Sequence, residues 1–115
     1  MTVEHDFKAQ KDDTFQAFAE LSAETDLPGT ADLDFFFIQD SDEADWVPLA
    51  RALEQQDFLC DWVDDDEEAE LPYLIATLSD QPLSAQSIWA AEEIATKLAL
   101  EHGFLPDGWG LEACI

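Results

Sequence analysis

Apolar residues recur along the chain with two periods, and this pattern predicts both helices and strands. Between residues 7 and 23, Phe15, Phe18 and Ala19 follow the i, i+3, i+4 spacing that is typical of an amphipathic helix. Pro28 and Gly29 break the pattern. Residues 33–38 then form a short, aromatic-rich run, which predicts a strand. Because both faces of that strand are apolar, we expect it to be central and covered on both sides.

A second helix is predicted over residues 41–56. Asp40, followed three residues later by Glu43, resembles a capping box at its start. Pro48 lies in an early turn, slightly beyond the position that proline prefers. The apolar stripe of this helix comprises Trp46, Leu49, Ala50 and Leu53.

The rest of the chain alternates between strand and helix patterns. Residues 58–63 and 71–78 predict two strands, joined as a hairpin across the acidic run 64–70. A long helix opens at Pro82 and Ser84 and ends before Gly103. Its expected apolar stripe comprises Ile88, Ala91, Ile94, Ala95 and Leu98. Residues 106–108 (Pro-Asp-Gly) predict a turn, and residues 109–115 a final strand.

This order, a helix followed by βαββαβ, predicts an α+β fold of the ferredoxin-like sandwich type with an additional N-terminal helix. We divide the chain into an N-terminal helix and linker (1–30) and a ferredoxin-like domain (31–115). The second and fourth strands of this topology are opposite edges of the sheet. Cys60 and Cys114 are therefore expected to lie too far apart for a disulfide.

One face of such a sheet has no helices from the βαββαβ unit. It would present either Phe35 and Phe37 or Phe36 and Ile38, and leaving such a patch open is unfavourable. The N-terminal helix, a homodimer or a partner protein would each cover it. We favour the helix, because its phenylalanines need a place to pack.

Charge changes the picture more than any motif does. The chain has 28 Asp and Glu against 4 Lys and Arg, a formal net charge of −24. Such a surface repels nucleic acids and anionic membranes and attracts basic proteins or cations, although solubility explains acidity about equally well. No segment is apolar enough to span a membrane, and the N-terminus predicts no signal peptide. With only two cysteines, we expect a cytoplasmic protein.

The acidic run is the obvious candidate for a site. It lacks the glycine and the ligand spacing of a calcium loop, so we expect no metal there. We instead predict a solvated hairpin loop, with contact to a basic protein segment as the functional alternative. The residues proposed for that contact are Asp64, Asp65, Asp66, Glu67 and Glu68. No nucleotide-binding, metal-binding or triad motif is present, so we predict neither a cofactor nor catalysis.

The run Asp107-Gly108-Trp109-Gly110, which follows a long helix and opens the last strand, resembles the RraB family, the regulators of ribonuclease E activity B. The resemblance extends to the acidic N-terminal helix, the Ser-Asp-Glu-Ala run at 41–44 and the acidic hairpin. It implies a non-catalytic protein that binds an RNase E-type endoribonuclease at its basic scaffold region. We expect the motif itself to be structural, with Gly108 allowing a positive φ and Trp109 anchoring the strand.

The leading hypothesis is therefore an acidic regulator that binds a ribonuclease or another basic protein. One alternative is an immunity-type protein that neutralises a basic toxin, with its acidic residues clustered near 64–70. Another is a small-molecule-binding domain. An apolar cleft containing a buried carboxylate of shifted pKa would favour this last alternative.

Overall fold

The computed structural model describes residues 6–24, 26, 27, 29–40, 43–64 and 72–113, with the side chains of 111–113 excepted. The elements are α1 (Phe7–Glu24), β1 (Thr30–Gln39), α2 (Trp46–Glu54), β2 (Leu59–Val63), β3 (Tyr73–Pro82), α3 (Ala85–Glu101) and β4 (Phe104–Ala113). No helix among the described residues is long and apolar enough to cross a membrane.

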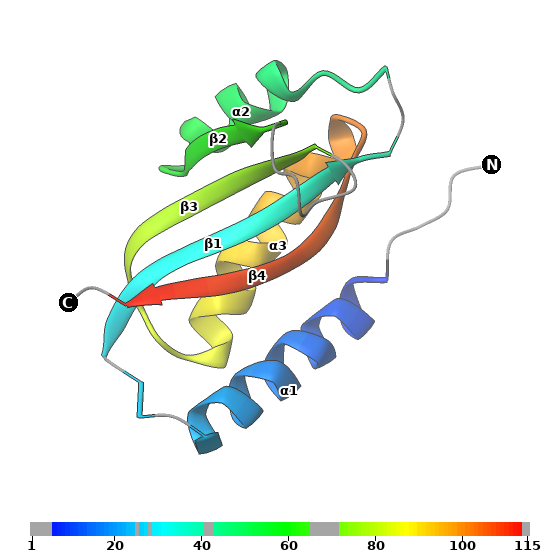
Figure 1. Cartoon of the computed structure of the whole chain (residues 1–115). Helices are drawn as coiled ribbons and strands as arrows, with labels where there is room; N and C mark the ends of the chain where they lie inside the picture. Colours follow the sequence, from blue (N-terminus) through cyan, green and yellow to red (C-terminus); the bar gives the residue numbers. More distant parts are fainter. Residues whose placement is uncertain (1–5, 25, 28, 41–42, 65–71, 114–115) are drawn as a thin grey trace.

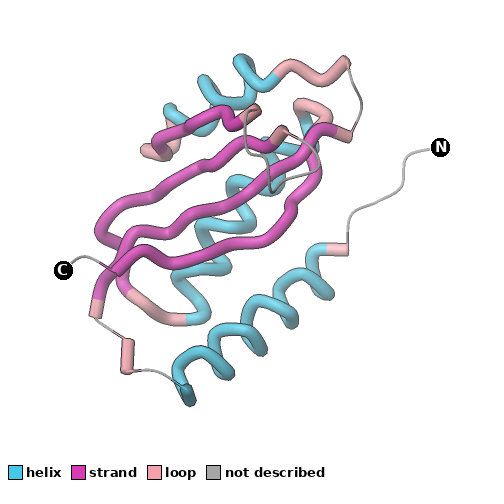
Figure 2. The backbone as a smooth tube through the Cα atoms, viewed as in Figure 1, coloured by secondary structure: helices cyan, strands magenta, loops and turns pink. Residues whose placement is uncertain are grey.

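The four strands form one antiparallel sheet in the order β2-β3-β1-β4. Figure 1 shows α3 behind the sheet and α1 alongside α3, and Figure 2 shows the strands passing in front of α3. The predicted ferredoxin-like α+β fold with an additional N-terminal helix is confirmed. The order also places β2 and β4 at opposite edges, as the topology requires.

The core lies between the sheet and the helices. Leu33, Phe35 and Phe37 of β1 are at most 1% exposed, whereas the residues between them are half-buried. They pack with Leu49 and Leu53 of α2 and with the inward residues of β3 and α3. β1 is therefore central, as predicted, but among the described residues helices cover only one of its faces, so the expected cover on both sides is not found there. Phe36 and Ile38, on the face away from the helices, pack beside side chains of β3 instead of beneath a second layer of helices.

The helix ends follow their capping residues. Asp45, rather than Asp40, caps α2 by accepting a hydrogen bond from the Val47 amide at 3.0 Å. Pro48 is then the third residue of the helix, where its missing N–H has no intrahelical acceptor in any case. Ser84 caps α3 as predicted, and Gly103 follows its end with a φ of 79°.

The buried face of α1 differs from the prediction. Phe15 is 36% exposed, and the cation of Lys11 lies 5.6 Å from its ring centre. Thr14 is the buried residue of the helix, and Phe18 packs against the core. The expectation that α1 covers the open face of the sheet is wrong: among the described residues, α1 packs against α3, on the helix side.

This position of α1 also changes α3. Ile94 is 44% exposed instead of forming part of the apolar stripe, and Trp89, Glu92 and Thr96 are buried. Because α1 packs against α3, a different set of α3 residues is buried from the one that the apolar stripe predicted.

Candidate functional site

Polar side chains join α1 to α3. Gln10 Nε2 donates a hydrogen bond to Thr96 Oγ1 at 3.0 Å, and Thr14 Oγ1 donates to a carboxylate oxygen of Glu92. Thr14, Glu92 and Thr96 are at most 4% exposed. Buried polar atoms need such partners, so these bonds define where α1 lies along α3.

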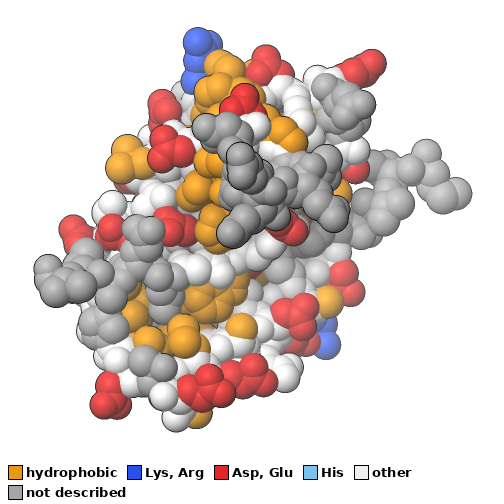
Figure 3. Space-filling view, in the orientation of Figure 1, with side chains coloured by type: hydrophobic (Ala, Val, Ile, Leu, Met, Phe, Trp, Pro, Cys, Tyr) orange, Lys and Arg blue, Asp and Glu red, His pale blue; other side chains and the backbone are white. Residues whose placement is uncertain are grey.

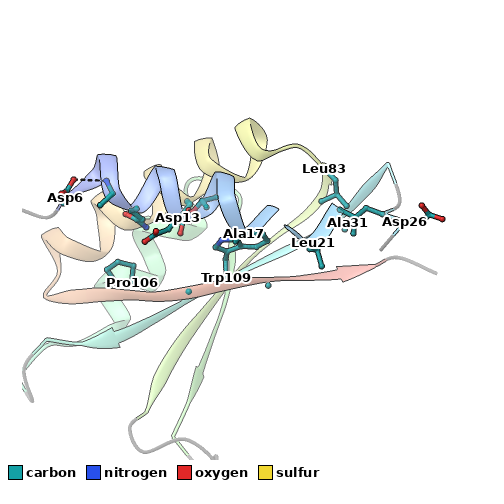
Figure 4. A pocket seen from close by; sticks show the side chains of 16 residues that line it. Asp6, Asp13, Ala17, Leu21, Asp26, Ala31, Leu83, Pro106 and Trp109 are labelled. Carbon is teal, nitrogen blue, oxygen red and sulfur yellow. Dashed lines mark hydrogen bonds between the residues drawn. The ribbon is translucent and has the colours of Figure 1, made fainter. Parts of the chain in front are cut away.

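A groove with a volume of about 1120 Å³ opens between α1 and β4, and we call it the α1–β4 groove (Figure 4). Its α1 wall consists of side chains spaced four residues apart, and its β4 wall centres on an aromatic ring. The residues that shape it are Ala9, Asp13, Ala17, Leu21, Pro106 and Trp109. Because Ala9 and Ala17 have small side chains, the space between helix and strand is not filled.

The groove is apolar but carries only negative charge. Four carboxylates line it, those of Asp6, Asp13, Asp26 and Glu92, and no Lys, Arg or His does so among the described residues. Asp6 accepts a hydrogen bond from the Ala9 amide at 3.0 Å, which caps α1. The exposed Asp13 carboxylate lies between α1 and β4 in Figure 4. A cation near an apolar group is therefore the chemistry that this groove complements.

The motif Asp107–Gly110 lies at the β4 wall. The expected turn at residues 106–108 is wrong, because β4 is continuous there and absorbs an extra residue as a bulge between the pairs Phe36–Gly108 and Phe37–Pro106. Gly108 has a φ of 120°, a backbone conformation that residues with side chains rarely adopt.

Trp109 is half-buried, packs against the core and lines the groove. Its neighbour Gly110 faces the other side of the sheet, where an added Cβ would lie 3.8 Å from the Phe36 ring. The motif thus shapes the strand on both faces: the Trp109 ring forms a wall of the groove, and Gly110 leaves room for Phe36.

The open face of the sheet is a second apolar surface. It presents Phe36 and Ile38 of β1 beside Ile75 and Tyr73 of β3, with which they pair. The rings of Phe36 and Tyr73 meet edge to face at 6.1 Å. In Figure 3, hydrophobic side chains lie over the strands and beside α1, with Asp and Glu around them.

Polar side chains interrupt this open face. Thr77 Oγ1 donates to Asp34 Oδ1 at 2.6 Å, and Asp61 of β2 lies opposite Ile75. Leu59, at 67% exposure, is its most exposed apolar side chain among the described residues. The aromatic side chains of the open face therefore pack against one another, and carboxylates lie beside them.

Of the acidic run, the structure describes only Asp64, which is exposed just after β2. Asp65, Asp66, Glu67 and Glu68 lie outside the described residues. Among the residues that are described, no group of three or more His, Cys, Asp or Glu side chains is arranged to hold a metal ion.

The other chemically distinctive side chain is Cys60, on the covered face of β2. Burial, and then the nearby carboxylates of Glu54 and Asp61, raise the pKa of its thiol to about 12. The thiol is therefore protonated at neutral pH and is a poor nucleophile. Cys60 is a free cysteine, and Cys114 lies outside the described residues.

The model of one family, regulator of ribonuclease activity B, matches residues 12–111. The chain belongs to the RraB family. The match begins within α1 and ends within β4, so it includes the β4 wall of the α1–β4 groove, the α1 wall from Asp13 onwards and the open face. No curated protein matches the chain. The resemblance inferred from the Asp107–Gly110 motif is therefore confirmed at the level of the family.

Sequence reasoning missed the groove in this RraB domain. One available signal was the spacing of polar Gln10 and Thr14 in α1, together with that of Glu92 and Thr96 in the apolar stripe of α3. Polar residues four apart on each of two helices are consistent with a polar contact between them, although the same spacing is common on solvated faces.

Proposed function

We propose that this chain is a regulator that binds an RNase E-type ribonuclease, or the basic scaffold region of such an enzyme, and catalyses no reaction itself. The observation that carries the proposal is the family match over residues 12–111. The family description, a regulator of ribonuclease activity, implies a protein partner.

The charge of the chain supports a basic partner. If every one of its 4 Lys and Arg paired with a carboxylate, 24 of its 28 carboxylates would still lack a cation. Two ion pairs, Lys8–Asp12 at 3.9 Å and Lys97–Glu93 at 3.8 Å, lie on exposed helix surfaces and contribute little. A basic scaffold segment would supply the missing cations and would be attracted over a distance of roughly 8 Å at physiological salt.

A small-molecule-binding domain is the second candidate, because the α1–β4 groove is apolar and contains the buried carboxylate of Glu92. Its chemistry favours binding over catalysis. Among the described residues, no His, Lys, Cys or Ser lines it, and the Thr14 hydroxyl is already bonded to Glu92. An activated hydroxyl, thiol or amine nucleophile therefore has no source there.

The proposal is tested by measuring binding of the purified chain to a full-length RNase E-type enzyme and to the same enzyme without its scaffold region. We expect binding at about 50 mM salt, a loss of at least tenfold in affinity at about 500 mM, and none without the scaffold. Absence of binding to the full-length enzyme at low salt would refute the proposal.

The contact role of the acidic run is tested separately. Changing Asp64, Asp65, Asp66, Glu67 and Glu68 to Asn or Gln should leave the unfolding temperature almost unchanged and weaken nuclease binding by about tenfold. The matched control neutralises five exposed carboxylates elsewhere: Asp12, Glu20, Glu24, Asp40 and Glu101. Equal losses in the two variants would mean that only total charge matters and that the run is not a contact site.

A further inference from the structure

The shape of the α1–β4 groove indicates a chain-like occupant. Its lining residues on α1 extend from Ala9 to Leu21, a length of about 18 Å at 1.5 Å per helical residue. With a volume of about 1120 Å³, it is larger than a single side chain fills. An elongated apolar groove beside a helix accommodates a row of side chains from one peptide segment.

The charges of the groove define that segment further. The Trp109 ring and the Leu21 side chain provide apolar contact, while Asp13 lies at the mouth and Glu92 is buried in the α3 wall. With no cation among the described lining residues, an acidic peptide would be repelled. Apolar side chains would enter the groove, and neighbouring Lys or Arg residues would lie against Asp13.

A second copy of this chain is a poor occupant. Each copy carries a formal net charge of −24, so two copies repel each other before any apolar contact forms. The 4 Lys and Arg of a copy are too few to reverse that repulsion. The same negative electrostatic field attracts a basic partner.

We propose that the α1–β4 groove is the docking site for a segment of a basic protein in which apolar residues alternate with Lys or Arg. The inference deepens the proposed function and rests on it for the identity of the partner. It assigns apolar recognition to the groove, and leaves long-range attraction to the acidic surface as a whole.

Two labelled peptides of about 12 residues test the groove directly, one alternating Leu with Arg and one with Ser in place of every Leu. Both carry the same charge. Fluorescence anisotropy should give an affinity at least tenfold higher for the Leu-Arg peptide. Equal affinities would overturn the inference, because charge alone would then explain binding.

A variant that fills the groove locates the binding. Ala17 is exposed and lines the groove, whereas Ala19 is exposed on another side of the same helix. Ala17→Trp should weaken binding of the Leu-Arg peptide by about tenfold, and Ala19→Trp by less than about twofold. Thermal unfolding of both variants controls for folding. Wild-type affinity in a folded Ala17→Trp variant would rule the groove out.

A matched pair of variants tests how much the Asp13 carboxylate contributes to peptide binding. Asp13→Asn and Asp12→Asn each remove one carboxylate from neighbouring positions of α1, but only Asp13 lines the groove. We expect a loss of about threefold for Asp13→Asn and almost none for Asp12→Asn. Equal effects would contradict a local contact at Asp13.

Two further results separate this inference from the proposed function. If Ala17→Trp retains the nuclease as well as wild type does, the groove is wrong while the function stands. If wild type does not bind the nuclease, the function fails and the peptides alone decide the groove. Displacement of the Leu-Arg peptide by hexylamine at a similar concentration would also overturn the inference, in favour of a small-molecule pocket.

Discussion

The α1–β4 groove and the open face of the sheet lie on opposite sides of the same strands, yet they are different kinds of surface. On the open face, Phe36 packs against Tyr73 and over Gly110, so the aromatic side chains fill the space between themselves. In the groove, Trp109 and the small side chains of Ala9 and Ala17 line the same space and do not fill it.

The difference shows that apolar exposure alone does not define a binding surface. Side chains on neighbouring strands lie about 5 Å apart and can pack against one another, which is why the open face is stable without a covering helix from the described part of the chain. A groove requires two elements held apart. Here the bonds from Gln10 and Thr14 to α3 hold the helix in place beside β4.

The largest expected effect tests which side of the sheet is covered. Cys60 faces the helices, and its thiol has a pKa of about 12 instead of 9.0. In a Cys114→Ser background, iodoacetamide at pH 8 should modify it about a thousandfold more slowly than a model thiol, because only the thiolate reacts. Since the folded state retains this proton, stability should fall as the pH rises from 9.0 towards 12.

The adjacent position on the open face supplies the control. Leu59, which is 67% exposed, becomes the only thiol in a Leu59→Cys variant that also carries Cys60→Ala and Cys114→Ser. Its alkylation rate should approach that of the model thiol. Similar slow rates at positions 59 and 60 would show that something covers both faces of β2.

The next prediction compares the Trp109 ring in the groove with the Phe36 ring on the open face. Trp109→Ala should lower the free energy of unfolding by about 3 kcal/mol, because the ring packs against the core as well as lining the groove. Phe36→Ala, which removes a half-buried ring from the open face, should lower it by about 1–2 kcal/mol. Chemical denaturation measures both. A larger loss for Phe36→Ala would make the open face the better-packed surface.

The last comparison tests what holds the groove open. Thr14→Val removes the hydroxyl that donates to the buried Glu92 carboxylate, and should lower the unfolding free energy by about 1–3 kcal/mol. Thr14→Ser keeps the hydroxyl and should recover most of this loss. If both substitutions lower stability equally, the methyl group rather than the hydrogen bond holds α1 against α3.

Several features were predictable from short stretches of sequence. The aromatic-rich run at residues 33–38 identified β1, Ser84 and Gly103 marked the ends of α3, and the order of elements indicated the ferredoxin-like sheet. Each of these signals depends on local geometry: the period of a strand or helix, the cap of a helix, or the length of a connection.

The candidate groove was not predictable in the same way. Thr14 and Glu92 are polar, so their pattern indicated solvent, whereas they are buried against each other across 78 positions of sequence. The run at residues 106–108 has the composition of a turn, but pairing with β1 holds it in the strand as a bulge. Long-range contacts decided both outcomes.

By itself, then, the sequence determined the elements, their order, the strongly acidic charge and, through Asp107–Gly110, the family. Only the tertiary structure decided that α1 lies beside α3 and not over the open face, and hence that a groove exists beside β4. The physical reason is that amphipathic periodicity reports that a residue will be buried, but carries no information about which distant element will bury it.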